Sequence, residues 1–212
     1  MKATILLTLA LLFGMTACRT GGSNAKASAD SSATVPVDSS SFQATGHFAE
    51  FLASVSNLTL PLTLTCGIPK ELPTRHRMYA DSAMQVYYPA SCDLVVGRLW
   101  SERQYAAILY GAIGDWIYPE ITTFDHSGNP IDSLRIDVYC EGEPGFTGSS
   151  VMHVLTDRTI NVVDTLWTAA LDSSHNEISG TDSTVVRTEV FRIDSLGRTS
   201  SHGQSQVRLF PK

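Results

Sequence analysis

Apolar residues recur at helical spacing in only one stretch of this sequence. The segment 46–55 carries them at the i, i+3, i+4 and i+7 positions of a single helix face: Phe48, Phe51, Leu52 and Val55. Thr45 precedes the segment as a candidate N-cap. Pro61 then interrupts any helix and begins an extended run at 60–65. The pattern therefore predicts one short amphipathic helix followed by extended chain.

The rest of the chain alternates between apolar and polar residues in short runs that are rich in Val, Ile, Thr and Tyr. Such runs predict strands near 84–88, 93–100, 104–112, 116–124, 131–140, 150–156, 159–170, 183–193 and 205–210. In the run 131–140, Leu134, Ile136, Val138 and Cys140 share one face. Polar segments at 125–129, 172–176 and 194–197 predict hairpin turns.

Short strands separated by turns predict a mainly β fold, with an α+β arrangement left open. We expect one domain over residues 43–212, built as an antiparallel meander with the N-terminal helix packed on it. The meander could curl toward a barrel.

The first residues differ from this domain in composition. Lys2 is followed by an apolar run from Ile5 to Phe13, which only Thr8 interrupts. This run is too short to span a bilayer, which takes about 20 apolar residues. It has the length of the apolar core of a secretory signal peptide, and we expect residues 1–17 to be that signal.

The end of this segment, Met15-Thr16-Ala17-Cys18, resembles the lipobox recognised by lipoprotein signal peptidase, although most lipoboxes carry Leu where this chain has Met15. The resemblance implies cleavage before Cys18, attachment of diacylglycerol to its sulfur, and acylation of the new N-terminus. It also implies a lipid-anchored protein of the cell envelope. Because Arg19 rather than Asp follows the cysteine, the outer membrane is favoured, on either its periplasmic or its surface face.

Residues 18–42 are mostly small and polar, which predicts a lipidated cysteine and a flexible linker. The chain carries 15 basic and 21 acidic residues, a formal net charge of −6. This balance argues against a nucleic acid partner. The expected partners are the membrane, through the lipid anchor, and an unidentified protein or glycan.

A second resemblance rests on Phe48, Phe51 and Leu52, on Leu60-Pro61, and on the segment TFDHSGNPIDSL at 123–134. Together they are similar to uncharacterised lipoproteins of Bacteroidetes. These motifs are structural, so the resemblance transfers no catalytic residue to this chain.

Three cysteines remain beyond Cys18, so at most one intramolecular disulfide can form among Cys66, Cys92 and Cys140. We favour the pair Cys66–Cys92, because it closes the shortest loop. Cys140 would then be a free thiol in the core. The alternative is that all three are buried and reduced.

No common catalytic or nucleotide-binding motif is present, and no catalytic residue or cofactor is predicted. Asp137, Glu141 and Glu143 form a weak candidate Ca²⁺ site, but they lack the spacing of a calcium loop. A solvated acidic loop is the simpler interpretation. His126 and His175 fall in predicted turns and are interpreted as solvent-exposed.

Two further groups could contribute to binding. Arg75-His76-Arg77 is a basic island that could hold a carboxylate or a phosphate. Six aromatic residues could form a glycan platform, although core packing is the simpler interpretation for residues on strands: Trp100, Trp116, Trp167, Tyr105, Tyr110 and Tyr118.

A recurring tripeptide resembles the O-glycosylation sequence of Bacteroidetes envelope proteins, which consists of Asp, then Ser or Thr, then a small or aliphatic residue. The candidate acceptors are Ser82, Ser133, Thr165, Ser183 and Ser195. Ser82 is the strongest candidate because it falls in a predicted loop.

Three functional classes remain open. A non-catalytic binding or structural module is favoured, because catalytic motifs are missing. The alternatives are a hydrolase of envelope or dietary polymers and an inhibitor or immunity-type lipoprotein.

Overall fold

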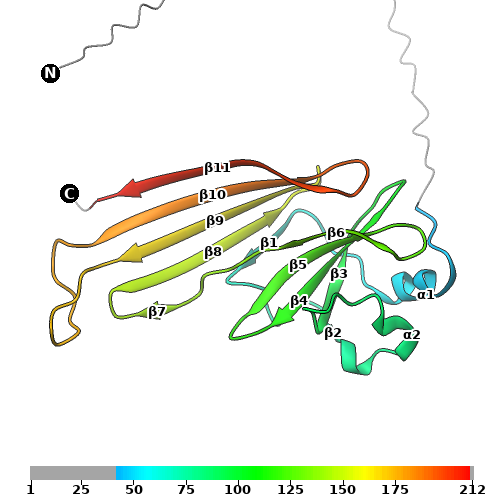
Figure 1. Cartoon of the computed structure of the whole chain (residues 1–212), viewed down its shortest axis with the longest axis horizontal. Coiled ribbons are helices and arrows are strands. Elements are labelled where there is room, and N and C mark those ends of the chain that lie inside the picture. The colour runs from blue at the N-terminus through cyan, green and yellow to red at the C-terminus, as the bar shows by residue number, and fades with distance from the viewer. Residues whose placement is uncertain (1–41, 211–212) are drawn as a thin grey trace, which may run out of the picture. The chain divides into compact units, whose positions relative to one another are not determined.

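A computed structural model of the protein describes residues 42–210, which fold into two antiparallel sheets (Figure 1). Sheet A has the order β2-β3-β4-β5-β6, with strands Arg75–His76, Leu94–Ser101, Ala106–Ile113, Ile117–Phe124 and Pro130–Arg135. Sheet B has the order β1-β8-β9-β10-β11, with strands Leu62–Thr65, Phe146–Val154, Thr159–Thr168, Ser183–Ile193 and Thr199–Leu209. The short strand β7, Gly142–Glu143, also pairs with β8. The predicted mainly β fold is confirmed.

The helices cover one face of sheet A. Helix α1, Gly46–Ser54, has the predicted bounds to within one residue and buries the predicted face. Thr45 is its N-cap residue, but its hydroxyl donates to the carbonyl of His126 rather than to the helix. Phe48 and Phe51 pack in a cluster with Tyr88, Ile108 and Tyr110 of the segment after α2 and of strand β4.

The predicted strand at 84–88 is wrong. A 3-10 turn at Arg77–Tyr79 leads into the short helix α2, Ser82–Gln85. The carbonyl of Asp81 accepts the N–H groups of both Met84 and Gln85, and helical turns continue to Tyr88. Because the two tyrosines after α2 pack on Phe48 and Phe51, tertiary contacts rather than strand propensity decide this segment.

The other face of sheet A packs on sheet B. Strand β4 is buried on both sides, which is why its sequence AAILYGAI does not alternate. Ala107 and Leu109 contribute to the core between the sheets. Met152, Val154, Ile160 and Val162 enter the same core from β8 and β9. We call the face of sheet B that carries these four residues its inner face.

The three predicted hairpin turns are confirmed and share one construction. The carboxylate of Asp125 accepts the backbone N–H groups of Ser127 and Asn129 at 2.8 and 2.9 Å. Asp172 and Asp194 make the equivalent pairs of bonds in the other two turns. Each turn has a residue of positive φ three positions after its aspartate: Gly128, His175 and Gly197.

The sheets do not close into a barrel, so the predicted curling is corrected. The predicted strand 131–140 is a strand of sheet A only as far as Arg135, and the N–H of Ile136 makes the last backbone bond to β5, to the carbonyl of Pro119. Beyond that point the chain leaves sheet A and crosses to sheet B, where Tyr139 and Glu141 bond to the edge of β8. None of the helices within residues 42–210 has the length and apolar character needed to cross a membrane.

Candidate functional site

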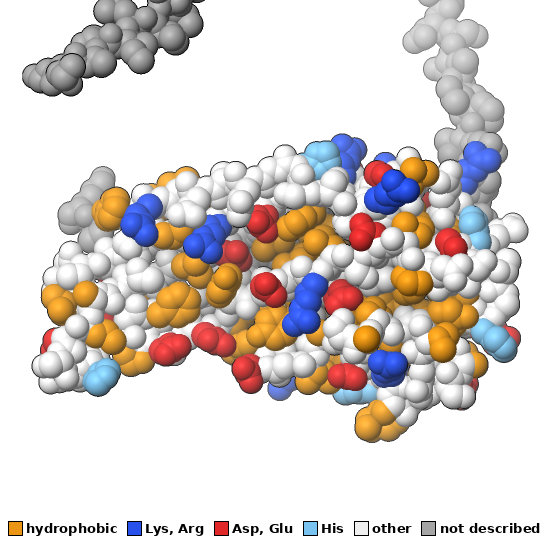
Figure 2. All heavy atoms as spheres, in the orientation of Figure 1, with side chains coloured by type: hydrophobic (Ala, Val, Ile, Leu, Met, Phe, Trp, Pro, Cys, Tyr) orange, Lys and Arg blue, Asp and Glu red, His pale blue; other side chains and the backbone are white. Residues whose placement is uncertain are grey.

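A cleft of about 200 Å³ lies beside the segment that crosses between the sheets. We call residues 135–139 the crossing segment. One wall of the cleft is this segment, and the other is the inner face of β9, β10 and β11. Its lining residues are Arg135, Ile136, Asp137, Tyr139, Val162, Asp164, Arg187, Glu189, Phe191 and Gln204. In Figure 2, acidic and basic side chains gather over the junction of the two sheets, beside apolar surface.

Strand register explains why charged residues line an inner face. Residues directly opposite each other on neighbouring antiparallel strands share a face. Val162 lies opposite Glu189, and Asp164 lies opposite Arg187. Glu189 in turn lies opposite Gln204. The row that begins in the apolar core therefore becomes polar as it runs outward across the sheet.

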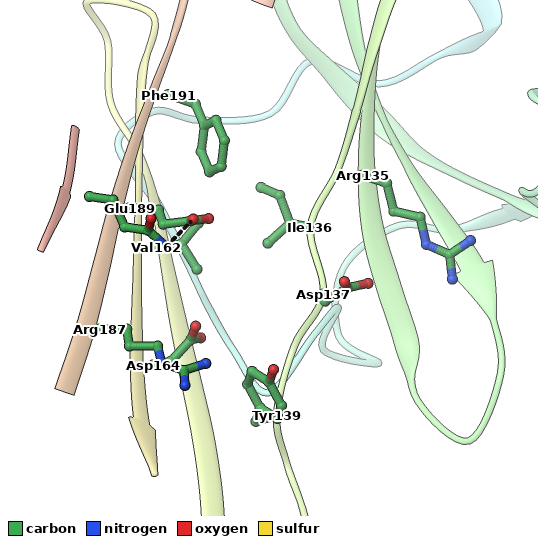
Figure 3. A pocket seen from close by; sticks show the side chains of 10 residues that line it. Arg135, Ile136, Asp137, Tyr139, Val162, Asp164, Arg187, Glu189 and Phe191 are labelled. Atoms are coloured by element: carbon green, nitrogen blue, oxygen red, sulfur yellow. Dashed lines mark hydrogen bonds between the residues drawn. The ribbon is translucent and has the colours of Figure 1, made fainter. Parts of the chain in front are cut away.

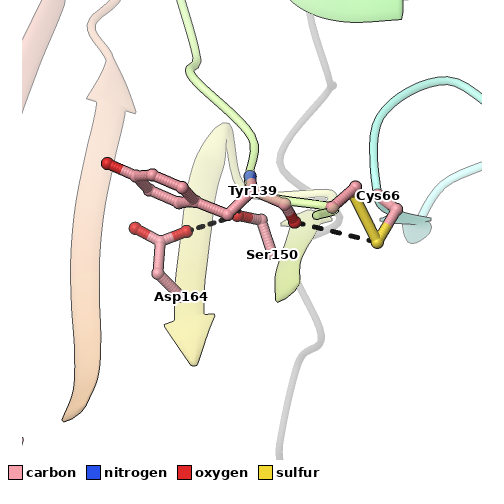
Figure 4. The surroundings of a disulfide bond; sticks show 5 residues. Cys66, Tyr139, Ser150 and Asp164 are labelled. Carbon is pink, nitrogen blue, oxygen red and sulfur yellow. Dashed lines mark hydrogen bonds between the residues drawn. A yellow bond between two sulfur atoms is a disulfide. The ribbon is translucent and has the colours of Figure 1, made fainter. Parts of the chain in front are cut away.

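The crossing segment is fastened to sheet B at its end (Figure 4). Tyr139 donates its backbone N–H to Ser150 Oγ at 2.7 Å, and the Ser150 hydroxyl donates to Asp164 Oδ1 at 2.6 Å. A disulfide joins Cys66, after β1, to Cys140, with 5.1 Å between their Cα atoms. These bonds hold the crossing segment, which forms one wall of the cleft, against sheet B.

The predicted pairing Cys66–Cys92 is therefore wrong. Loop length favoured it, but β1 and the crossing segment follow one another along the same edge of β8, which brings Cys66 and Cys140 together. Cys92 is instead the free and buried cysteine of the described part. Cys140 is not a free core thiol.

Arg187 is the distinctive group of the cleft. Its Nε atom is buried and has no hydrogen-bond partner among the described residues. Its cross-strand neighbour Asp164 accepts from Ser150 instead, and no carboxylate of the described part lies within 4.0 Å of the Arg187 nitrogens. Figure 3 shows Arg187 and Asp164 on the same side of the cleft, across from Tyr139 of the crossing segment.

The other polar and charged side chains of the cleft differ in the contacts that they make. Gln204 donates its side-chain amide to Glu189 at 2.9 Å. Arg135 extends away from Arg187 (Figure 3) and lies over the ring of Tyr118, 5.5 Å from its centroid. Asp137 is exposed, and its side chain makes no hydrogen bond within residues 42–210. Arg187 and Asp137 are therefore left available to a ligand.

The weak candidate metal site does not assemble. Asp137, Glu141 and Glu143 are all exposed. Within the part of the chain that the structure describes, no three His, Cys, Asp or Glu side chains lie close enough to hold a metal ion. Asp137 lines the cleft, whereas Glu141 immediately precedes β7 and Glu143 is the last residue of that strand.

The histidines of the predicted turns have separate environments. His126 interacts through Nδ1 with the carbonyl of Gln43, and its ring stacks on Phe42. His175 is exposed, as predicted. His153 contacts the hydroxyl of Thr63 and His202 that of Ser200. None of these contacts joins a histidine to the cleft.

The six aromatic residues do not form one surface. Trp100, Tyr105 and Tyr110 are buried in the two cores. Trp116 is exposed in the turn before β5, and Trp167 lies half-buried on the outer face of sheet B. The basic island at 75–77 is at the edge of sheet A, where Arg75 and His76 form β2. Neither group lines the cleft.

The candidate glycosylation sites differ in exposure. Ser82, Ser133, Thr165 and Ser195 are exposed, and Ser183 is half-buried at the start of β10. The Ser133 hydroxyl bonds to Thr122 at 2.8 Å, and that of Ser183 bonds to Thr168 at 3.1 Å. Modification of these residues stays a prediction. Cys18, the signal segment and most of the linker lie outside the described residues.

Sequence reasoning missed the cleft residues of sheet B. Arg187 and Glu189 alternate with valine and threonine in the predicted strand 183–193, on the same face as Val185 and Ile193. Two charges on a face that also carries apolar core residues were the available signal. Comparison of the chain with protein-family models, with curated proteins and with solved structures found no match.

Proposed function

We propose that this chain is a non-catalytic binding module of the cell envelope, tethered by a lipid on Cys18, which holds an acidic glycan in the cleft beside the crossing segment. The lipid anchor and the envelope location rest on the lipobox resemblance. The ligand class rests on the chemistry of the cleft.

The observation that carries the proposal is the free donor of Arg187. A buried donor without a partner costs about 1–3 kcal/mol of stability. A ligand carboxylate would supply the missing acceptor, and the planar guanidinium group suits a carboxylate better than a lysine would. The half-buried setting of Arg187 strengthens such a bond relative to one in open water.

The remaining lining favours a sugar as the carrier of that carboxylate. Asp137 and Glu189 offer acceptors for hydroxyl groups, and Gln204 can both donate and accept. Tyr139 and Phe191 supply aromatic surface for an apolar sugar face. The small volume suits one sugar unit of a chain rather than a large ligand.

The test is calorimetric titration of the full chain with oligomers of galacturonic acid. Arg187→Met removes the donor while keeping an unbranched side chain, and we expect binding to weaken by about 10- to 100-fold, as for loss of one hydrogen bond to a charged group. Arg192→Met is the matched control, because Arg192 lies on the same strand but on the opposite, exposed face.

The neutral oligomer of galactose should bind at least ten times more weakly than the acidic one. Equal affinity of the two oligomers, or an Arg187→Met protein that binds like wild type, would contradict the proposal. An acidic peptide that bound while all acidic saccharides failed would assign the cleft to a protein partner instead.

A further inference from the structure

Strand β11 is an open edge of sheet B. Within residues 42–210 it pairs with β10 on one side only. Every residue from Ser200 to Phe210 is exposed, and the half of the strand toward its C-terminal end lies farthest from sheet A (Figure 1). Such an edge presents unpaired backbone N–H and C=O groups to any extended strand.

Natural edge strands are kept from pairing by charges, prolines, β-bulges or inward-pointing charged residues. In β11 these features are confined to a β-bulge beside residues 201–203 and to Arg208 near the end of the strand. Residues 199–207 contain no Asp, Glu, Lys, Arg or Pro. At the C-terminal end of this segment and just beyond it, three large apolar side chains are more than half exposed: Val207 at 55%, Leu209 at 53% and Phe210 at 69%. A long uncharged stretch followed by exposed apolar residues is typical of an interface.

The backbone groups that point outward can be assigned from the hydrogen-bond pattern. Ile193 donates its N–H to the carbonyl of Arg158, on the β9 side of β10. In antiparallel sheets, alternate residues bond to alternate neighbours. Residues 185, 187 and 189 of β10 therefore bond toward β9, and their partners on β11, Arg208, Gln206 and Gln204, direct their backbone groups outward.

We propose that β11 pairs with β11 of a second copy of this chain, antiparallel about a two-fold axis at Gln206. In this register Gln206 faces Gln206 of the second copy, and Gln204 faces Arg208, so the two Arg208 side chains are kept apart. The pairing forms about six backbone hydrogen bonds between the outward groups. A two-fold interface of this kind is self-complementary by symmetry.

Side-chain sizes favour this register. Leu209 would lie opposite Gly203 of the second copy, and nothing in the described chain lies within 4 Å of the space beside Gly203. Val207 would lie opposite Ser205. Val207 and Leu209 therefore each meet a small residue and are covered by the neighbouring strand without a clash, whereas Phe210 would lie beside His202.

The pairing would join the two copies of sheet B into one continuous sheet. Because the two-fold axis is perpendicular to the sheet, both clefts would open on the same side, and one polymer could engage both. The dimer itself does not depend on the ligand, so its test stands apart from that of the proposed function.

The test is cross-linking of the full chain with a short bismaleimide at a single introduced cysteine. Gln206→Cys should give a cross-linked dimer, because the two copies of residue 206 face each other. Gln204→Cys is the matched control: its copies are offset by four residues, about 13 Å along the strand, and we expect several-fold less product. The wild-type chain gives the background from its own cysteines.

A second measurement is sedimentation of the unmodified chain and two variants. Gln206→Pro removes an outward N–H that the fold itself does not use, so it should give monomers, whereas Gln206→Ala should still dimerise. A wild-type chain that sediments as a monomer and gives no cross-link would overturn the proposal. So would a dimer that Gln206→Pro leaves intact, or equal cross-linking at residues 204 and 206.

Discussion

At the scale of single residues, the structure separates the three cysteines by environment. Cys92 is buried beneath the helices, and burial, together with the nearby Glu120, raises the pKa of its thiol to about 12 despite a hydrogen bond with Ser91. A thiol that stays protonated at neutral pH is a poor nucleophile. Cys92 therefore has the environment of a packing residue rather than a reactive one.

This difference predicts a labelling pattern. In the native protein at pH 7.5, iodoacetamide should leave Cys92 unmodified, and unfolding in guanidinium chloride should expose it to complete alkylation. Peptide mapping without reduction should find Cys66 linked to Cys140. A peptide that joins Cys66 to Cys92, or rapid alkylation of Cys92 in the native state, would contradict the structure.

Arg187 differs from Cys92, because its Nε atom is buried but has no hydrogen-bond partner within residues 42–210. If the unpaired Nε destabilises the free protein and is paired only in the ligand complex, Arg187→Met should have two effects. It should stabilise the free protein by about 1 kcal/mol, and it should weaken the ligand complex. Urea denaturation with and without ligand measures both effects. A structural arginine would behave in the opposite way, since its removal would destabilise the free protein.

At the scale of elements, the connections between strands place different requirements on two of their glycines. Gly128 and Gly180 both have φ near +80°. A methyl group at Gly128 would lie 2.5 Å from Tyr87 Cε1 and 2.7 Å from Phe48 Cγ, whereas one at Gly180 would meet nothing within 4 Å. The first glycine is required by packing and by conformation, and the second by conformation alone.

The two alanine variants should therefore differ in stability. Gly180→Ala should lose about 1 kcal/mol, the cost of a left-handed conformation for a residue with a Cβ. Gly128→Ala adds a clash with the aromatic cluster under α1, and we expect a total loss of about 2–4 kcal/mol. Thermal denaturation of both proteins measures the difference. Equal losses would mean that the cluster repacks without cost.

Most elements could be predicted because they bury apolar residues in a regular pattern. The strand predicted at 183–193 has those bounds, and the one at 93–100 is displaced by one residue. Strands β8 and β11 were predicted too short. Their missing portions, 146–149 and 199–204, are mostly small or polar residues. Backbone pairing with a neighbouring strand forms them, and no apolar pattern marks such pairing in a sequence.

At the scale of the whole molecule, the cleft could not be predicted, because it depends on where the chain crosses between sheets. The alternation at Leu134, Ile136 and Val138 correctly indicated one buried side, since Ile136 and Val138 lie in the core. It could not show that the strand of sheet A ends at Arg135. The same crossing determines the disulfide, which loop length alone misassigned.

The disulfide should stabilise the whole domain as well as the wall of the cleft. Cys66 and Cys140 are 74 residues apart, and closing a loop of that size stabilises by about 4 kcal/mol in the chain-entropy model. We expect Cys140→Ser to lower the free energy of unfolding by about 2–4 kcal/mol and to weaken ligand binding. Cys92→Ser, which replaces the free cysteine, should leave ligand binding unchanged. Identical urea midpoints for Cys140→Ser and the wild type would contradict this role.

The two sheets are also joined by Asp132 of β6. Its Oδ2 atom accepts the backbone N–H of Thr199 at 2.7 Å and the Thr199 hydroxyl at 2.5 Å. Partial burial raises the pKa of Asp132, but these bonds outweigh it, so the pKa lies below its ordinary value. Asp132 is therefore a pH-dependent link between sheet A and the start of β11.

A carboxyl group with a lowered pKa stabilises the fold above its unfolded pKa, about 3.9 for Asp, and this contribution is lost as the pH falls through the folded value. Asp132→Asn should lower the stability by about 1–2 kcal/mol at pH 7. It should also flatten the decline of stability below about pH 4. Thr199→Val, which keeps the N–H donor and removes the hydroxyl, should have part of each effect. Urea denaturation of the three proteins between pH 2 and pH 7 is the measurement. Parallel curves for wild type and Asp132→Asn would show that Thr199 does not hold this carboxylate in the folded state.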